Sequence, residues 1–265
     1  MSTRHAQIAV LGGSGFYRFL DDVTEVAVDT PFGPPSDQLA VGELESRPVA
    51  FLPRHGRNHS LPPHVINYRA NLWALKEIGV ERILGPVACG SLRREVAPGH
   101  FVVCDQLVDR TSGRRDTFYD GPRTTHVSFA DPFCPELRRL TAEAGSALGI
   151  TVHDGGTIVV VQGPRFSTRA ESAFYAGQGW DVINMTAYPE AALARELEMC
   201  YVNISLATDY DVGIEGVPAV TTEAVVQVLR ENNERVQQLL LELIPAIPTA
   251  RTCPCATALG GARLD

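Results

Sequence analysis

The sequence alternates short apolar runs, rich in β-branched residues, with longer segments of helical periodicity, and this alternation limits the fold more than any other feature. The runs typical of buried strands are residues 8–11, 39–44, 49–52, 83–87, 101–104, 157–161, 182–183 and 201–207. Apolar residues at helical spacing predict helices at 67–78, 135–148, 169–176, 189–198 and 221–243. Strands that alternate with helices predict an α/β fold, in which helices flank a largely parallel or mixed central β-sheet.

The chain shows no glycine- or serine-rich linker, no internal repeat and no low-complexity block. Its 265 residues suit one sizeable domain, or at most two small ones. We therefore expect a single domain over residues 1–250 and a C-terminal tail over residues 251–265. The irregular stretches 31–35 and 110–125 are candidates for active-site or subunit-contact loops.

The charge balance excludes some classes of partner. Acidic residues outnumber basic ones by 31 to 23, for a net charge of −8. No basic stripe is available to follow a phosphodiester backbone, so we expect no nucleic-acid partner, and a bound anion would need a local device. The apolar runs are too short for a bilayer span or a signal peptide, so we expect a cytoplasmic protein without membrane contact.

Two clusters at predicted strand ends suit an anion. Ser14 lies in a Gly-Gly-Ser-Gly turn after the first strand, where exposed backbone N–H groups approach ligands closely. Arg54 and His55 follow residues 49–52 and offer a guanidinium fork with one more imidazole donor. A plain strand-exit turn and a solvated basic loop are the alternatives. A metal site of His55, His59 and His64 is less favoured, because consecutive prolines make this segment a loop.

Three further clusters also follow predicted strands. The small residues of segment 85–92, including Val87 and Ala88, favour tight packing beneath a helix. Phe166 and Ser167 could hold a flat heterocycle, although Ser167 could instead cap the next helix. Residues 184–186 and 208–211 end two apolar runs, and the carboxyl groups within 208–211 need either a ligand with donors or a place at the surface.

Six cysteines occur, at positions 89, 104, 134, 200, 253 and 255. Buried, reduced thiols are the default in a large cytoplasmic chain. Cys253 and Cys255 lie in a polar tail, but a Cys-x-Cys pair without a second pair is weak evidence for zinc. An inert or loosely ordered tail is the favoured interpretation.

In combination these segments resemble the trimeric purine nucleoside phosphorylase family, and within it the 5′-methylthioadenosine phosphorylases. The resemblance is carried by GGSGFY, PFGPPSD, PRHGRNH, INYRANLWALKEIG, ACGSLRREVAPG, DQLVDRT, FADPFCP, QGPRFSTRAES, VINMTAYPEAALARE and ATDYD. They follow the family order from about residue 8 to residue 211. The combination is specific where each piece alone is not.

The resemblance implies a single α/β domain with a distorted mixed sheet, assembled as a homotrimer or a dimer of trimers. It implies a pentosyltransferase that uses orthophosphate as co-substrate and needs neither a metal nor an organic cofactor. Phosphate would be bound by Ser14, Arg54, His55, the backbone of Ala88 and Thr186. The nucleoside would be bound by Met185 at the ribose and by Phe166, Ser167, Asp209 and Asp211 at the purine. Asp209, in its protonated form, and His55 would be the catalytic residues.

Two positions depart from the family pattern. Val87 stands where threonine is common, which keeps a backbone N–H for phosphate and loses a hydroxyl. Thr222 stands where an apolar residue often faces a 5′-methylthio group, so a 5′-hydroxyl could also be admitted. Both residues remain candidates for the site.

The expected function is reversible phosphorolysis of 5′-methylthioadenosine, or a related 6-aminopurine nucleoside, in purine and methionine salvage. A phosphorylase for 6-oxopurine nucleosides is the first alternative, and a non-catalytic nucleoside-binding regulator is the second. The two aromatics of segment 129–135 would reach a neighbouring subunit, since they would be poorly placed in water. By the same resemblance, Cys253 could bridge to Cys255 and Cys134 to Cys200, although a reducing cytoplasm disfavours both bridges.

Overall fold

The computed structural model describes residues 6–14, 16, 19–122, 124–212, 216 and 221–263. Gly15 of the glycine turn and the last two residues of the predicted tail lie outside these described residues. Among the described residues, no helix combines the length and the apolar character that crossing a membrane requires.

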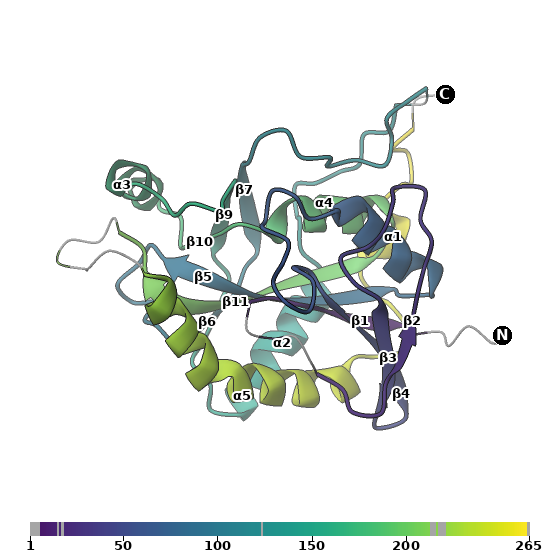
Figure 1. The fold of residues 1–265 in the computed structure, drawn as a ribbon, viewed down its shortest axis with the longest axis horizontal. Helices are drawn as coiled ribbons and strands as arrows, with labels where there is room; N and C mark the ends of the chain where they lie inside the picture. The colour runs from purple at the N-terminus through teal and green to yellow at the C-terminus, as the bar shows by residue number, and fades with distance from the viewer. Residues whose placement is uncertain are drawn as a thin grey trace.

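The centre of the molecule is a mixed β-sheet of 11 strands (Figure 1). The strands are β1 (Ile8–Gly12), β2 (Thr24–Val26), β3 (Leu39–Leu44), β4 (Arg47–Pro53), β5 (Arg82–Ser91), β6 (Phe101–Val103), β7 (Gln106–Arg110), β8 (Val152–Asp154), β9 (Thr157–Val161), β10 (Val182–Asn184) and β11 (Cys200–Tyr210). The main path runs β2-β3-β4-β1-β5-β10-β9-β7, while β11 pairs with β5 and β6, and β8 with β6.

Strand β5 is responsible for the distortion of this sheet. Its first residues pair in parallel with β1, whereas its last two pair antiparallel with β10. Strand β11 follows β5 in parallel along nearly its whole length. The sheet is therefore mixed and bent, which confirms the predicted fold class.

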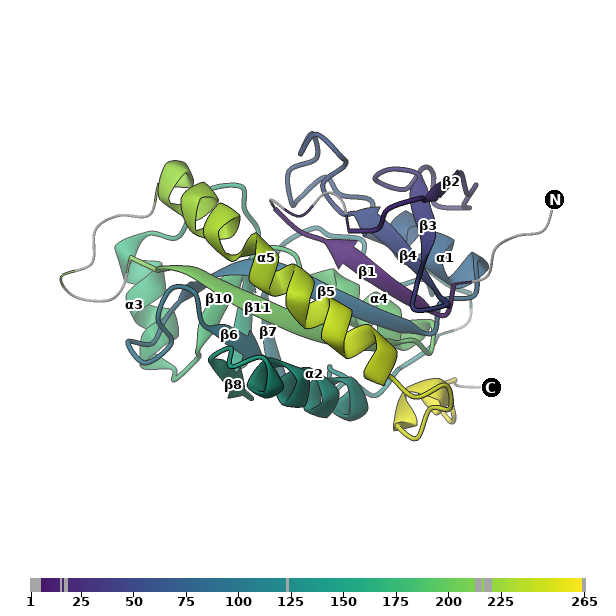
Figure 2. The same ribbon diagram turned by 90° about the horizontal axis from the view of Figure 1, so that it is seen from below.

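The helices cover both faces of the sheet (Figures 1 and 2). They are α1 (Tyr68–Glu77), α2 (Pro135–Ala147), α3 (Arg169–Gly177), α4 (Ala187–Glu196), α5 (Thr222–Ala246) and the short η1 (Pro254–Thr257). Alternation in β1 shows the two layers: Ala9 and Leu11 pack with α1 and α4, whereas Ile8 and Val10 pack with α2 and α5.

Local sequence explains where the helices begin. The side chain of Asn67 accepts a hydrogen bond from the backbone N–H of Ala70 and caps α1. Thr168 and Glu171 form a capping box at the start of α3, so the cap is Thr168 and not the predicted Ser167. Helix α4 begins at Ala187, two residues before the predicted start, with a non-helical kink at Tyr188.

The structure corrects several predicted strands. β5 continues to Ser91, so Val87 lies within the strand and not at its end, and Ala88 lies inside the strand and not after it. Strands β2, β7 and β8 were not predicted, because each is short and carries few buried apolar residues. An edge strand of three residues has too little hydrophobic pattern to stand out from a loop.

Two segments that were expected to be exposed are packed onto the domain. Phe133 is 2% exposed and stacks on Tyr201, and Phe129 is half-buried against the same core, so these aromatics do not need a second subunit to leave water. The C-terminal segment is also not a loose tail. Arg251 donates to the Glu198 carbonyl at 2.7 Å and Cys255 is buried, so this segment packs onto the domain.

Candidate active site

A cavity of about 740 Å³ opens where several strands of the sheet end. It is lined by the residues that follow β1, β4 and β10, by the middle of β5, by the last residues of β11 and by the first turns of α5. All the residues proposed from the sequence line it: Ser14, Arg54, His55, Val87, Ala88, Phe166, Ser167, Met185, Thr186, Asp209, Asp211 and Thr222. A ligand cavity at the carboxyl ends of strands is typical of α/β folds.

Arg54 is held rigidly at one end of the cavity. Its side chain is fully buried, and its Nε and Nη2 atoms bind the two oxygens of Glu190 at 2.7 and 3.1 Å. Its Nη1 atom donates to the Pro86 carbonyl at 2.9 Å. Burial opposes the charge on Arg54, but the Glu190 carboxylate more than offsets this and raises the pKa of Arg54. These contacts use three of the five N–H donors that a guanidinium carries, and the cavity lies beside the rest.

Gly13 allows this arginine to approach the turn after β1. A Cβ atom at position 13 would lie 2.9 Å from Nη1 of Arg54 and 3.0 Å from the Pro86 carbonyl oxygen. Such distances are too short for a side chain, so glycine is required here. The guanidinium therefore lies directly against the backbone that carries Ser14 into the cavity.

His55 presents an acceptor to the cavity. Its Nδ1 lies 2.9 Å from the carbonyl oxygen of Leu61, and since a carbonyl only accepts, Nδ1 carries the hydrogen. Burial, together with the charge of Arg54, lowers the pKa of His55 to about 3, so the imidazole is neutral near pH 7. Nε2 is then an unprotonated acceptor, and the extra donor expected from the sequence requires an imidazolium that this environment disfavours.

Thr186 lies at the start of α4, beside Arg54's partner Glu190 in the same helix. The side-chain oxygen of Asn184 accepts from the backbone N–H groups of Thr186 and Ala187 at 3.3 and 3.4 Å. The Thr186 hydroxyl makes no capping hydrogen bond, and it accepts from Nδ2 of Asn184 at 3.4 Å, which leaves its own hydrogen available. Thr186 can therefore turn its hydroxyl toward a ligand in the cavity that it lines.

Asp209 and Asp211 also line the cavity, and burial is the main influence on the pKa of each carboxyl group. Burial raises the pKa of Asp209 to about 6, and the nearby Asp211 carboxyl adds to the effect. Burial also raises the pKa of Asp211, whereas hydrogen bonds from Ser172 and the backbone of Val212 oppose it. Within the described part of the chain, Oδ2 of Asp211 is buried and has no hydrogen-bond partner.

The geometry of β11 places the carboxyl groups of Asp209 and Asp211 at the cavity. The register of β11 against β5 shifts between Ala207 and Asp209, so a β-bulge at this point re-orients the following residues. Gly90 of β5 lies opposite, and a Cβ there would lie 3.2 Å from Oδ1 of Asp209 and 3.3 Å from Cβ of Asp211. The glycine leaves room for both carboxyl groups.

The hydroxyl of Thr208 lies between two acceptors. Its Oγ1 is 3.2 Å from the carbonyl oxygen of Cys89 and 2.7 Å from Oδ2 of Asp209. A hydroxyl has one hydrogen, so when Thr208 donates to Cys89, Asp209 must donate in turn. When Thr208 donates to Asp209 instead, this hydrogen bond lowers the pKa of Asp209 and partly offsets the effect of burial. A proton on Asp209 is then available on its other oxygen.

Most of the remaining lining is apolar or aromatic. Phe166 is 41% exposed and lines the cavity, so its ring is available to stack on a flat ligand. Val225, Val226 and Leu229 of α5 form another part of the wall. Val225 and Leu229 lie in the helix predicted over residues 221–243, and nothing in its apolar periodicity indicated that this helix reaches the cavity.

Glu190 and Tyr201 support Arg54 from outside the cavity and were not predicted from the sequence. The Tyr201 hydroxyl donates to Oε2 of Glu190 at 2.9 Å, and both residues are buried. A glutamate within a predicted helix gave no sign of burial. The alternative histidine metal site gains no support, since His55 and His59 stack at 4.3 Å while His64 is exposed and does not line the cavity.

Comparison with known proteins places this geometry in a family. Residues 7–245 match the model of the phosphorylase superfamily. A purine nucleoside phosphorylase of Streptomyces coelicolor is 54% identical over 97% of this chain and 95% of its own length. An S-methyl-5′-thioadenosine phosphorylase of Thermofilum pendens is 53% identical over 96% of this chain and 97% of its own.

A solved structure shows a similar fold. The methylthioadenosine phosphorylase of Schistosoma mansoni, in complex with adenine, superposes with a TM-score of 0.93 at 35% identity. The match covers 97% of this chain and 99% of that one.

Proposed function

The chain belongs to the phosphorylase superfamily and is an enzyme of the pentosyltransferase type, and from this premise we propose that it catalyses the reversible phosphorolysis of 5′-methylthioadenosine. The products are adenine and 5-methylthioribose 1-phosphate. Since the chain is an enzyme, the alternative of a non-catalytic regulator is set aside.

The preference for adenine rests on the two buried carboxyl groups of Asp209 and Asp211. Adenine presents an amine donor at C6 and an acceptor at N7. A protonated Asp209 donates to N7 through one oxygen and accepts through the other, and Oδ2 of Asp211 is a buried acceptor that lacks a donor. A 6-oxopurine presents acceptors at both positions, and the resulting mismatch costs about 1–3 kcal/mol.

We propose that phosphate binds at the Arg54 end of the cavity. The free N–H groups of Arg54, the hydroxyls of Ser14 and Thr186 and the backbone N–H of Ala88 supply donors. The neutral His55 accepts the hydrogen of monohydrogen phosphate at Nε2, because Nδ1 is already committed to the Leu61 carbonyl. Val87 contributes its backbone only, since it lacks the hydroxyl of threonine.

The reaction follows from this placement. As the glycosidic bond breaks, positive charge develops at the anomeric carbon and the phosphate dianion below it stabilises that charge. Negative charge moves onto the purine, and Asp209 delivers its proton to N7. Met185 lies along the ribose, Phe166 covers the purine and Ser167 lies beside it. The scheme uses phosphate as co-substrate and requires no metal or organic cofactor.

The apolar wall of α5 supports a methylthio group at the 5′ position. Val225, Val226 and Leu229 bury apolar surface when a thioether methyl replaces water against them. Thr222 adds a hydroxyl at the start of the same helix, so adenosine is also a substrate in this account, with lower efficiency.

A 6-oxopurine nucleoside phosphorylase is the second candidate. The Streptomyces coelicolor relative, which is as similar as the methylthioadenosine phosphorylases, is named a purine nucleoside phosphorylase. That name does not separate 6-amino from 6-oxo substrates.

Four nucleosides distinguish the two candidates: methylthioadenosine, adenosine, methylthioinosine and inosine. Base release is measured for each at equal concentration and saturating phosphate, for the native chain and for Asp209→Asn. We expect methylthioadenosine to be fastest, and Asp209→Asn to reduce its rate more than that of methylthioinosine, because an amide suits O6 and N7 together. Faster release of hypoxanthine than adenine by the native enzyme would establish the second candidate instead.

We also propose that the enzyme acts as a homotrimer, or a dimer of trimers, in the cytoplasm. The irregular stretches 31–35 and 110–125 contribute no described residue to the cavity lining, and we propose that they take part in subunit contact. Phe32, Trp73 and Phe118 form a half-buried aromatic group there, with ring centroids 5.2–5.8 Å apart. The six free cysteines are typical of a reducing compartment.

A further inference from the structure

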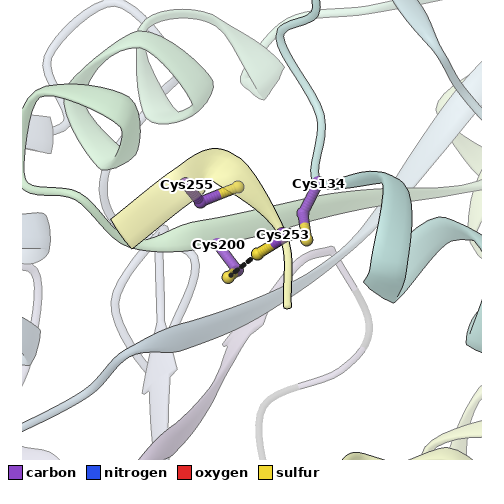
Figure 3. A group of neighbouring side chains, drawn as sticks. All are labelled: Cys134, Cys200, Cys253 and Cys255. Atoms are coloured by element: carbon purple, nitrogen blue, oxygen red, sulfur yellow. Dashed lines mark hydrogen bonds between the residues drawn. The ribbon is translucent and has the colours of Figure 1, made fainter. Parts of the chain in front are cut away.

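Four cysteines from distant parts of the sequence meet beside the C-terminal segment. They are Cys134, Cys200, Cys253 and Cys255, and their Sγ atoms all lie within 4.8 Å of one another. Figure 3 shows the four side chains together, from the starts of α2 and β11 and from the segment around η1. Cys200 begins β11 and Asp209 lies near its other end, so the cluster is roughly 30 Å from the catalytic site.

The backbone fixes these side chains before any ligand arrives. The N–H of Cys134 donates to the Tyr201 carbonyl at 2.9 Å, and the N–H of Cys200 donates to the Glu81 carbonyl at 2.9 Å. Cys134 and Cys253 occupy the cap positions of α2 and η1, yet neither side chain makes a capping hydrogen bond. The thiols are therefore not used by the helices that they precede.

The distances match one small tetrahedral ion. With Zn–S bonds of about 2.3 Å, tetrahedral geometry places sulfurs about 3.8 Å apart. The Cys200 and Cys253 sulfurs are 3.3 Å apart, and no pair exceeds 4.8 Å. Three of the four residues are buried, as expected of a closed structural site.

We propose that these four cysteines bind one Zn²⁺ ion as a structural tetrathiolate site. Four thiols lose four protons when the ion binds, and the four S–Zn bonds leave a net charge of −2. Thiolate sulfur in tetrahedral geometry favours zinc over magnesium or calcium, which prefer oxygen. The sequence argument against zinc was the lack of a second cysteine pair, and the fold supplies that pair in Cys134 and Cys200.

The site would fasten the end of the chain to the sheet. Beyond α5 the segment is held by a few polar contacts: Arg82 donates to the Thr249 carbonyl at 3.1 Å, and Leu259 N–H donates to Glu198 at 3.2 Å. The guanidinium groups of Arg82 and Arg251 bring positive charge to this region, and they share the Glu81 carboxylate at 3.5 Å. A zinc ion adds bonds that close two long loops of chain and thereby reduces local opening.

The test uses the full chain, purified with reductant and without chelator. We expect about one zinc ion per chain by elemental analysis, and four thiols that react with a thiol reagent only after a strong chelator removes the metal. Cobalt added to the apoprotein should give the absorption of tetrahedral thiolate coordination. The chelator should also lower the melting temperature by several degrees.

Cys253→Ser is the matched test variant, because Cys253 is the least buried ligand. Cys104→Ser is the control, since Cys104 is buried beside Ser205 at 3.8 Å and belongs to neither the cluster nor the cavity lining. Zinc should be lost from the first variant and retained in the second. If Cys253→Ser does not fold, zinc content and thiol protection of the native chain still decide the question.

Three results would overturn the proposal. One is a native chain whose thiols stay reactive when zinc is supplied. Another is an intact mass that shows disulfides among these cysteines under reducing purification. The third is zinc retained by a folded Cys253→Ser chain, or another metal in place of zinc in the native one.

Discussion

Burial matters most for function at Asp209, where it changes the pKa of the carboxyl group. The buried site raises its pKa to about 6, against 3.8 for a free side chain, and this keeps a proton available for the purine near neutral pH. The cost is stability. The folded chain holds this proton where the unfolded chain releases it, so stability falls as the pH rises from about 4 to about 6.

Asp209→Asn should remove that loss. Relative to the native chain, the variant should gain up to about 1–3 kcal/mol in the free energy of unfolding above pH 6, and little below pH 4. The measurement is urea unfolding of both proteins across this range. The comparison between variants is needed because His55, whose pKa is lowered to about 3, makes stability rise with pH below 6.5 in both proteins. A difference in stability that does not vary with pH would contradict the raised pKa.

Arg54→Lys tests the phosphate contact without leaving Glu190 unpaired. Lysine keeps the charge but loses the planar fork, so one charge-assisted hydrogen bond to phosphate, worth about 1.5–3 kcal/mol, is lost. The KM for phosphate should rise about 10- to 100-fold, while the KM for the nucleoside changes little. Steady-state kinetics with each substrate varied in turn gives both values. An unchanged KM for phosphate would remove Arg54 from the phosphate site.

At the scale of elements, α4 and β4 are joined through the pair Glu190 and Arg54, both of which are fully buried. Glu190→Ala would leave the Arg54 charge without a partner, and breaking such a pair costs about 3–5 kcal/mol. Glu143→Ala is the control, because Glu143 pairs with Arg139 on the surface of α2, with both side chains more than half exposed. Urea unfolding should show the large loss for the first variant and less than about 0.5 kcal/mol for the second. Equal losses would mean that the buried pair does not hold α4 to the sheet.

Elements with strong apolar patterns could be predicted from the sequence, and the others could not. The helices and the long strands repeat apolar residues at their own period, so their positions were close to those observed. β5 was predicted to end at Val87, because the residues that follow are small and include Gly90, although this glycine suits a strand that runs beside a ligand. Its continuation depends on pairing with β10, which no local pattern reveals.

The site was predictable for a related reason. Arg54, Thr186 and Asp209 are polar residues that directly follow or end apolar strands, and such residues are conspicuous in a sequence. Glu190 was missed because a glutamate in a helix resembles a surface charge. The apolar wall of α5 was missed because its residues resemble those by which a helix packs on the core. The zinc candidate was missed because Cys134, Cys200 and Cys253 come together only through the tertiary fold.

For the whole molecule, the proposed property that an experiment has to test is assembly into a homotrimer or a dimer of trimers. The burial of Phe133 within its own chain removes one argument for a trimer, and the aromatic group of Phe32, Trp73 and Phe118 now carries it. Analytical ultracentrifugation should give about three times the chain mass of 28.7 kDa, or six times for a dimer of trimers. Phe118→Asp should shift the population toward smaller species. A fully active monomer would contradict the proposed assembly.

If the cavity brings a nucleoside and phosphate together, each adenine released must be matched by one sugar phosphate formed. The enzyme is incubated with methylthioadenosine, with and without orthophosphate, and adenine is quantified beside the sugar phosphate by phosphorus NMR. The account predicts one phosphate consumed for each adenine released, and no release in the absence of phosphate. Adenine released at the same rate without phosphate, together with free methylthioribose, would contradict it.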